Sequence, residues 1–192
     1  MKNKQKEWVR KGYNYILPKG EYLIGDPCYV DYKIEKEKDT WMEFLNAWYS
    51  SASGLKDFNG YWKYIRENEI VVEKYFMSQS FKFRGLTAFA TSTKDGDGTY
   101  SDNEGNEYGV DSGSLGCVPI EVADPEQVKK AKKGNEFGLV YRKFDDDFYC
   151  KMMDGKFHID EFGPNSCIID TDPRPYYDCC ECDWDDCECE NW

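Results

Sequence analysis

The sequence lacks several features that would assign a function directly. It has a single histidine, His158, and it has no P-loop, glycine-rich dinucleotide turn, nucleophile elbow or His-Glu zinc helix. It also lacks an apolar run of the length that a signal peptide or a membrane span requires. These absences argue against the common cofactor-dependent enzymes, and they predict a cytoplasmic protein without a membrane partner.

Positive charge is scarce as well. The 192 residues carry 37 acidic side chains against 25 basic ones, a net charge of -12. Such a surface would repel phosphate backbones over most of its area, which argues against a direct nucleic-acid partner. Aromatic residues make up 17% of the chain, far more than a disordered acidic chain carries. The composition therefore predicts a folded domain with an aromatic-rich core.

The last residues differ from the rest of the chain in charge. Residues 178–192 hold seven acidic residues and no basic one, so the remainder is only mildly acidic. The stretch Asp172-Pro173-Arg174-Pro175 is the expected boundary, because proline cannot donate a ladder hydrogen bond. We expect a basic N-terminal segment over 1–19, a single α+β domain over 20–171, and a disordered, acidic, cysteine-rich tail over 172–192.

Five of the nine cysteines crowd this tail: Cys179, Cys180, Cys182, Cys187 and Cys189. An odd cysteine total without an export signal argues against a disulfide framework. A C-x-x-C followed by a C-x-C could close a tetrahedral Zn(II) site or a small Cu(I) cluster. The alternative is a solvated acidic tail with reduced cysteines. No cofactor is expected in the domain itself.

Alternating apolar residues predict strands along most of the domain. Residues 20–31 form a strand, a tight turn and a second short strand, with Tyr22 and Ile24 on one face and Leu23 on the other. Gly85 is expected to let the register slip through a bulge in a strand over 80–93. Two turn signals at 94–98 and 103–106 bracket a strand over 99–102. Further strands are expected over 70–77, 108–122, 137–143, 147–153, 156–160 and 167–170.

Capping signals predict two helices. Thr40 to Glu43 has the form of a capping box, and an apolar stripe follows at helical spacing. Asp124-Pro125 has the form of an N-cap and a first helical residue, with lysines closing the helix before Gly134. Residues 61–65 are expected either to form a short helix or to cover the core. The sum is an α+β fold of mostly antiparallel sheet, sandwich-like or strongly bent, with two or three short helices.

Four pieces of the sequence together resemble a known group of proteins. They are YLIGDPCYV over 22–30, GDGTY over 96–100, YGVDSG over 108–113 and CIIDT over 167–171. In this order they resemble small uncharacterised proteins that tailed bacteriophages and prophages encode. The resemblance implies a phage-type accessory protein acting in the host cytoplasm, and it brings no established activity with it.

The same pieces hold the candidate ligand-binding residues. Asp26 and Cys28 flank Pro27, and Asp111 lies among small residues; strand pairing that joined them would line a polar cleft with a general base. The alternative is that Asp26 caps the turn and Cys28 packs as a small apolar residue. The full predicted set is Asp26, Cys28, Tyr29, Asp97, Tyr100 and Asp111.

Two other chemistries are less favoured by the residues. An EF-hand loop starting at Asp95 would need Gly where Tyr100 stands and Glu where Asn106 stands, so a glycine-rich hairpin is the expected structure. His158 alternates with Phe157 and Ile159 in a short strand, and it is expected to face solvent or a cross-strand partner. No cysteine-protease signature surrounds any of the four cysteines outside the tail.

The leading functional hypothesis is therefore a binding protein without catalysis. It would recognise a host protein or a small ligand, and its acidic surface could occupy a basic site, for example of a host defence or nucleic-acid enzyme. The alternatives are an enzyme of an unrecognised class that uses the Asp/Cys cleft, a metal-binding module built on the tail, and a virion structural role. The oligomeric state stays open.

Overall fold

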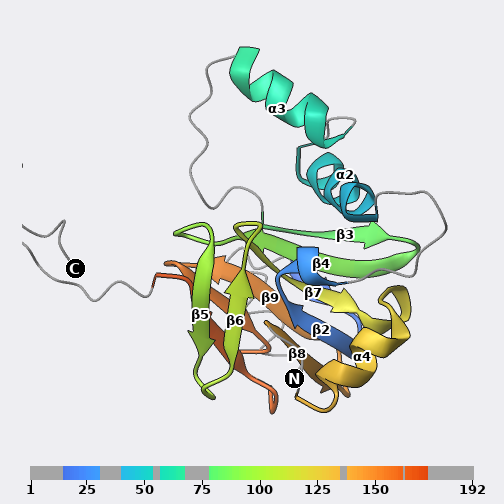
Figure 1. The fold of residues 1–192 in the computed structure, drawn as a ribbon, viewed down its shortest axis with the longest axis vertical. Helices are drawn as coiled ribbons and strands as arrows, with labels where there is room; N and C mark the ends of the chain where they lie inside the picture. The colour runs from blue at the N-terminus through green and yellow to red at the C-terminus, as the bar shows by residue number, and fades with distance from the viewer. Residues whose placement is uncertain are drawn as a thin grey trace, which may run out of the picture.

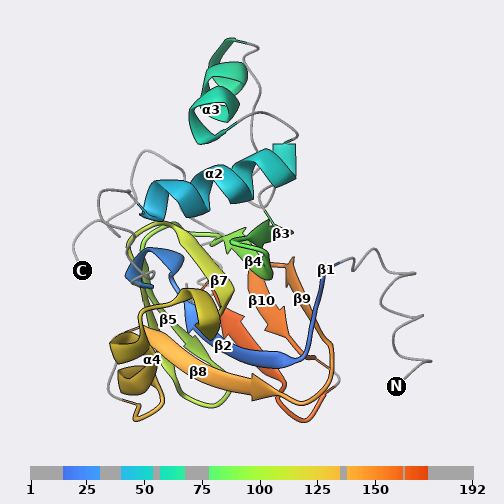
Figure 2. The ribbon, with the colours of Figure 1, turned by 90° about the vertical axis from the view of Figure 1, so that its right-hand side faces the viewer.

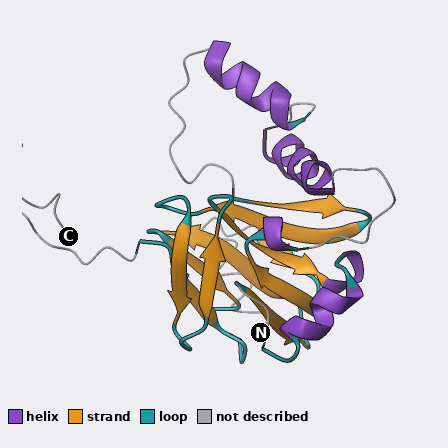
Figure 3. Ribbon diagram, in the orientation of Figure 1, coloured by secondary structure: helices purple, strands orange, loops and turns teal. Residues whose placement is uncertain are grey.

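The computed structural model describes residues 15–30, 40–53, 57–67, 78–134, 138–161 and 163–172. In these residues two antiparallel sheets pack face to face, and helices cover the far side of one of them (Figures 1 and 3). The α+β fold of mostly antiparallel sheet is therefore confirmed. The strand predicted over 70–77 and the cysteine-rich tail beyond residue 172 lie outside the described residues.

The strands divide between a six-stranded and a five-stranded sheet. The six-stranded sheet has the order β1 (Tyr15–Leu17), β9 (Phe148–Met153), β10 (Lys156–Ile159), β11 (Cys167–Asp170), β5 (Gly98–Asp102) and β6 (Glu107–Val110). The five-stranded sheet has the order β3 (Gln79–Phe83), β4 (Leu86–Ser92), β7 (Ser114–Pro119), β2 (Gly20–Gly25) and β8 (Leu139–Phe144). Strand β1 lies within the predicted N-terminal segment and pairs with β9, so the sheet extends upstream of residue 20.

Two strand predictions were wrong in a way that local backbone chemistry explains. Residues 80–93 hold no bulge: Arg84 and Gly85 form a two-residue hairpin turn between β3 and β4, with φ of 48° and 85°. Such a turn needs positive φ at both positions, which Gly adopts without strain. The second strand expected before Asp31 is instead the 3-10 helix η1 (Pro27–Tyr29), because Pro27 fixes φ and Asp26 caps the turn.

The segment expected as one or two strands over 108–122 is divided between the two sheets. Strand β6 belongs to the six-stranded sheet, and β7, after a turn at 111–113, belongs to the five-stranded sheet. Pro119 then ends β7, and the chain enters the 3-10 helix η2 (Ile120–Val122). The turn at 111–113 therefore carries the chain from one layer of the sandwich to the other.

The helices follow their predictions. Helix α2 (Thr40–Ser53) presents its apolar stripe to the five-stranded sheet, where Phe44 meets the ring edges of Phe81 and Phe83. Helix α3 (Phe58–Glu67) packs on α2 and stands away from the sheets (Figure 2). Helix α4 (Pro125–Ala131) starts as expected, with the Asp124 side chain accepting from the Glu126 backbone N–H at 2.8 Å. None of the described helices is long and apolar enough to cross a membrane.

These layers enclose two aromatic cores. One lies between the sheets and includes Tyr22, Phe89 and Phe157, whereas the other lies between the five-stranded sheet and the helices and includes Phe44 and Trp48. The alternation predicted for β2 is confirmed, since Tyr22 and Ile24 face the first core and Leu23 faces the second. The five-stranded sheet is thus buried on both faces, while no described helix covers the outer face of the six-stranded sheet.

Truncation of Trp48 should strongly destabilise the domain. Trp48 is 2% exposed at the centre of the helix-facing core, so Trp48→Ala leaves a cavity and should lower the free energy of unfolding by about 4 kcal/mol. Urea denaturation followed by far-ultraviolet circular dichroism measures the loss. Trp62→Ala is the matched control, because Trp62 is 39% exposed on α3 and its loss should cost less than half as much. Equal losses would show that α2 does not close this core.

Candidate functional site

The carboxylate of Asp26 is fully buried and accepts four hydrogen bonds. Its Oδ1 accepts from the Cys28 backbone N–H at 2.8 Å and from the Ser112 hydroxyl at 2.6 Å. Its Oδ2 accepts from the backbone N–H groups of Asp111 and Ser112, each at 2.8 Å. We call Asp26, Cys28, Tyr29, Asp111 and Ser112 the Asp26 junction. It ties the end of β2 to the turn between β6 and β7.

The junction brings together residues that the sequence predicted to meet, but with a different chemistry. Asp111 reaches Asp26 through its backbone N–H, and its own side chain is exposed. Asp26 caps η1, as in the alternative interpretation, and its acceptor sites are occupied by protein donors. A carboxylate held in this way stabilises two loops and is poorly placed to remove a proton from a substrate.

Cys28 and Tyr29 lie at the half-buried rim of the junction. Burial and the neighbouring Asp26 charge raise the pKa of the Cys28 thiol to about 12, so the thiol stays protonated at neutral pH. A hydrogen bond to the Asp111 carboxylate raises the pKa of the Tyr29 hydroxyl above its ordinary value. Neither group is activated as a nucleophile.

A second loop, residues 93–97, packs against the junction. The Thr93 backbone N–H donates to the Gly113 carbonyl at 2.9 Å, and the Thr93 hydroxyl donates to the Gly96 carbonyl at 2.6 Å. The Tyr100 hydroxyl also donates to Gly96, at 2.8 Å, and its ring is buried between the sheets. Asp97 is exposed on this loop. Of the predicted ligand-binding residues, Asp26 and Tyr100 are thus buried, and Asp97 and Asp111 lie at the surface.

The fourth sequence piece, CIIDT over 167–171, is hydrogen-bonded to the loop 93–97 through Thr171. The Thr171 hydroxyl donates to the Gly155 carbonyl at 2.6 Å and accepts from the Lys94 backbone N–H at 3.1 Å. The Lys94 ammonium group also pairs with the Asp172 carboxylate. All four pieces that carried the family resemblance are therefore linked at one end of the sandwich. Their polar residues build turns, and binding of a ligand by any of them stays a prediction.

Ser112 was not among the predicted site residues, although its backbone N–H and hydroxyl supply two of the four donors to Asp26. A hydroxyl residue next to glycine in a segment that must bend was the available signal. Ser112 was not predicted because its hydrogen bond to Asp26 joins positions 86 residues apart. In the glycine-rich hairpin expected over 95–106, the Asp102 Oδ1 accepts from the backbone N–H groups of Glu104 and Asn106 at 2.9 Å each.

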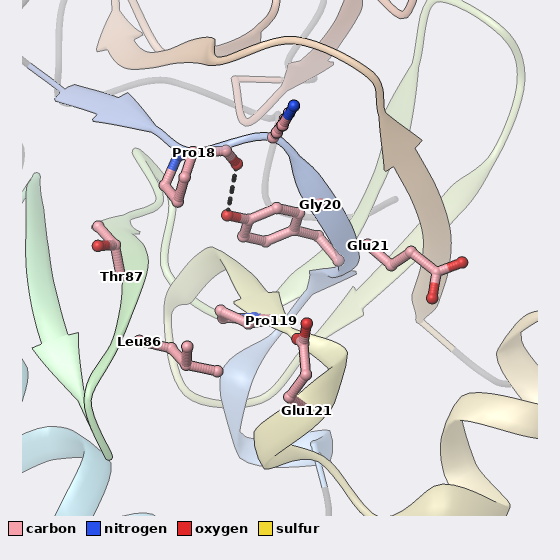
Figure 4. A pocket seen from close by; sticks show the side chains of 9 residues that line it. Pro18, Gly20, Glu21, Leu86, Thr87, Pro119 and Glu121 are labelled. Atoms are coloured by element: carbon pink, nitrogen blue, oxygen red, sulfur yellow. Dashed lines mark hydrogen bonds between the residues drawn. The ribbon is translucent and has the colours of Figure 1, made fainter.

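A small pocket lies at the other end of the sandwich, where Pro119 ends β7 between β4 and β2 (Figure 4). Its volume is about 80 Å³, against roughly 300 Å³ or more for typical small-molecule sites. Tyr22 lines the pocket, and its hydroxyl donates a hydrogen bond to the Pro18 carbonyl at 2.8 Å. The Glu21 carboxylate turns away from Pro119 and is paired with Lys132, whereas Glu121 also lines the pocket (Figure 4). The small volume leaves room for little beyond water.

Metal binding divides between the domain and the tail. In the part of the chain that the structure describes, no group of three or more His, Cys, Asp or Glu side chains is placed to hold a metal ion. The five predicted ligands, Cys179, Cys180, Cys182, Cys187 and Cys189, lie outside the described residues. A Zn(II) or Cu(I) site in the tail therefore stays a prediction from cysteine spacing.

In comparisons with known proteins, the chain matches no family model, no curated protein and no solved structure. The phage resemblance thus rests on the four sequence pieces alone.

Replacing Asp26 with Asn should destabilise the whole fold. Asn offers one acceptor oxygen, and its amide group would face backbone N–H donors, so Asp26→Asn should lower the free energy of unfolding by about 3 kcal/mol. Urea denaturation provides the measurement. Asp97→Asn is the control on the neighbouring exposed loop and should change stability by about 0.5 kcal/mol or less. A neutral Asp26→Asn would contradict the anchoring role.

Cys28 should resist alkylation in the native protein despite its partial exposure. A pKa of about 12, against an ordinary 9.0, lowers the thiolate fraction at neutral pH by roughly a thousandfold. Iodoacetamide treatment followed by peptide mass spectrometry should find Cys28 unmodified in the folded protein and modified in urea. Rapid labelling of Cys28 in the folded state would instead indicate an activated thiol and revive the enzyme hypothesis.

Proposed function

We propose that this chain is a phage-type accessory protein that binds a host protein through a basic surface of that partner, in the host cytoplasm. The supporting observation is that Asp26 holds the turn at 111–113 and Thr93 holds the loop 93–97, while the carboxylates of Asp111 and Asp97 stay exposed on them. Loops ordered before binding lose little conformational entropy when a partner docks. Exposed acidic groups on them steer and orient a basic partner.

The chemistry of the junction favours recognition over catalysis. Asp26 is occupied by four donors, and the pKa of the Cys28 thiol is raised, so the predicted cleft supplies neither a general base nor a nucleophile in the resting structure. The net charge of -12 adds long-range attraction for a basic surface. A host enzyme that itself binds nucleic acid carries such a surface, and we propose inhibition of an enzyme of this kind as the mode of action.

Removing the two exposed charges should abolish binding without unfolding the protein. Host proteins captured by the immobilised wild-type chain should be lost, by about tenfold or more, on the double variant Asp97→Asn/Asp111→Asn. The matched control is Asp145→Asn/Asp146→Asn, which makes the same charge change on the exposed turn between β8 and β9, at the opposite end of the sandwich. Quantitative mass spectrometry of the captured proteins gives the comparison.

Salt dependence separates this proposal from non-specific adhesion. Capture by the wild type and by the control variant should weaken together as ionic strength rises, because the charges are exposed. Equal capture by both double variants, or no enrichment over an unrelated acidic protein, would contradict recognition through these loops.

A further inference from the structure

A buried charged cluster lies on the outer face of the six-stranded sheet, away from the Asp26 junction. Lys151 on β9 and His158 on β10 are directly opposite each other in the antiparallel register. Their chain neighbours Cys150 and Phe157 face the inter-sheet core, so Lys151 and His158 face the other way. They are nevertheless only 3% and 7% exposed. A lysine and a histidine are thus held together out of water.

Glu161 supplies the opposite charge from the turn that follows β10. Asp160 adopts a left-handed conformation, with φ of 49°, which folds the next residue back over the sheet. The Glu161 Oε2 lies 2.8 Å from the Lys151 Nζ, and Oε1 lies 3.6 Å from the His158 Nδ1. That nitrogen is buried and has no hydrogen-bond partner among the described residues. Glu161 therefore contacts Lys151 closely and His158 only at a distance.

The turn itself depends on a few bonds around Asp160. The Gly163 backbone N–H donates to the Asp160 carbonyl at 2.7 Å, and the Asn165 backbone N–H donates to the Asp160 Oδ2 at 3.3 Å. A Cβ at position 163 would overlap the Asp160 carboxylate, which explains the glycine there. The amides of Gly163 and Asn165 thus report whether the hydrogen bonds that form this turn are intact.

Protonation of His158 opposes the closed arrangement. Burial lowers the pKa of His158, and the positive charges of Lys151 on β9 and Lys156 on β10 lower it further. Glu161 on the turn and Asp154 after β9 act in the other direction, with a smaller combined effect. On β11, Asp170 pairs with Lys156 at 3.0 Å.

The direction of the pH effect follows from this lowered pKa. His158 is neutral in the closed state at neutral pH, whereas an opened, hydrated His158 takes up a proton near its ordinary pKa of 6.5. As the pH falls below that value, the open state gains protons first and becomes relatively more stable. The contribution of neutral His158 to the closing free energy is fully lost once the pH has fallen through the pKa of the closed state.

We propose that Lys151, His158 and Glu161 form a pH-sensitive latch that holds the turn beginning at Asp160 on the sheet and releases it when His158 gains a proton. Release uncovers a face on which Ile16 and Met153 are already 40% and 37% exposed. Acidification would therefore enlarge a partly apolar surface that no described helix covers. This latch is independent of the proposed binding function, because it lies on a different face and uses none of the same residues.

The single histidine makes the test specific. Between about pH 7 and about pH 5 few other side chains titrate, so a response in this range belongs to His158. Amide hydrogen exchange followed by NMR should show the protection factors of Gly163 and Asn165 falling at least about threefold over this range. The protection of Leu23 in β2 should stay constant. Unchanged protection at Gly163 and Asn165 would overturn the proposal.

Two variants distinguish the latch from a non-specific loss of stability at low pH. In His158→Gln the pH response of the turn should vanish, and a response that persists would refute the role of His158. In Lys151→Met the fall in protection on acidification should be smaller, because one of the two cations that lower the pKa of His158 is removed while burial still lowers it. If His158→Gln fails to fold, Lys151→Met still decides the question, since a fall in protection as large as that of the wild type would contradict the mechanism.

Discussion

The buried carboxylate of Asp26 is the constraint on which the ends of the strands depend. A buried charge is tolerated only when hydrogen bonds compensate its lost hydration, and here three backbone N–H groups and one hydroxyl do so. Those donors come from η1 and from the turn that carries the chain between the two sheets. Asp26 therefore sets the point at which the chain changes layers, and the loops packed against that turn take their positions from it.

The outer faces of the two sheets differ in the side chains that cover them. The five-stranded sheet buries most of the apolar side chains of its outer face under α2 and α4. The outer face of the six-stranded sheet keeps the charged pair Lys151 and Glu161 beside His158. A packed aromatic face responds little to solvent conditions, whereas a face closed by few charged contacts responds to pH. The apolar core under the helices and the proposed pH-sensitive latch thus lie on opposite sides of the sandwich.

Prediction from the sequence succeeded where the signal is local. The stripe of α2 and the Asp124 cap depend on residues within a few positions of each other, and both are present in the structure. The bulge at Gly85 was wrong because a bulge and a two-residue hairpin share the same glycine signal, and only strand pairing distinguishes them. Ser112 and Glu161 were missed because nothing near them in the chain reveals their partners.

Local patterns in the sequence are sufficient for the fold class, the alternation of β2 and the Asp124 helix cap, because periodicity and backbone preference act over a few neighbouring positions. Only the tertiary structure decided what the polar residues do. Asp26 is an anchor and Asp111 an exposed carboxylate because strands distant in sequence place one inside and one outside. His158 is buried beside Lys151 through a pairing of β9 with β10 that composition does not encode. Burial and charge partners are properties of the packed chain, and they decide whether the same residue types stabilise, recognise or respond.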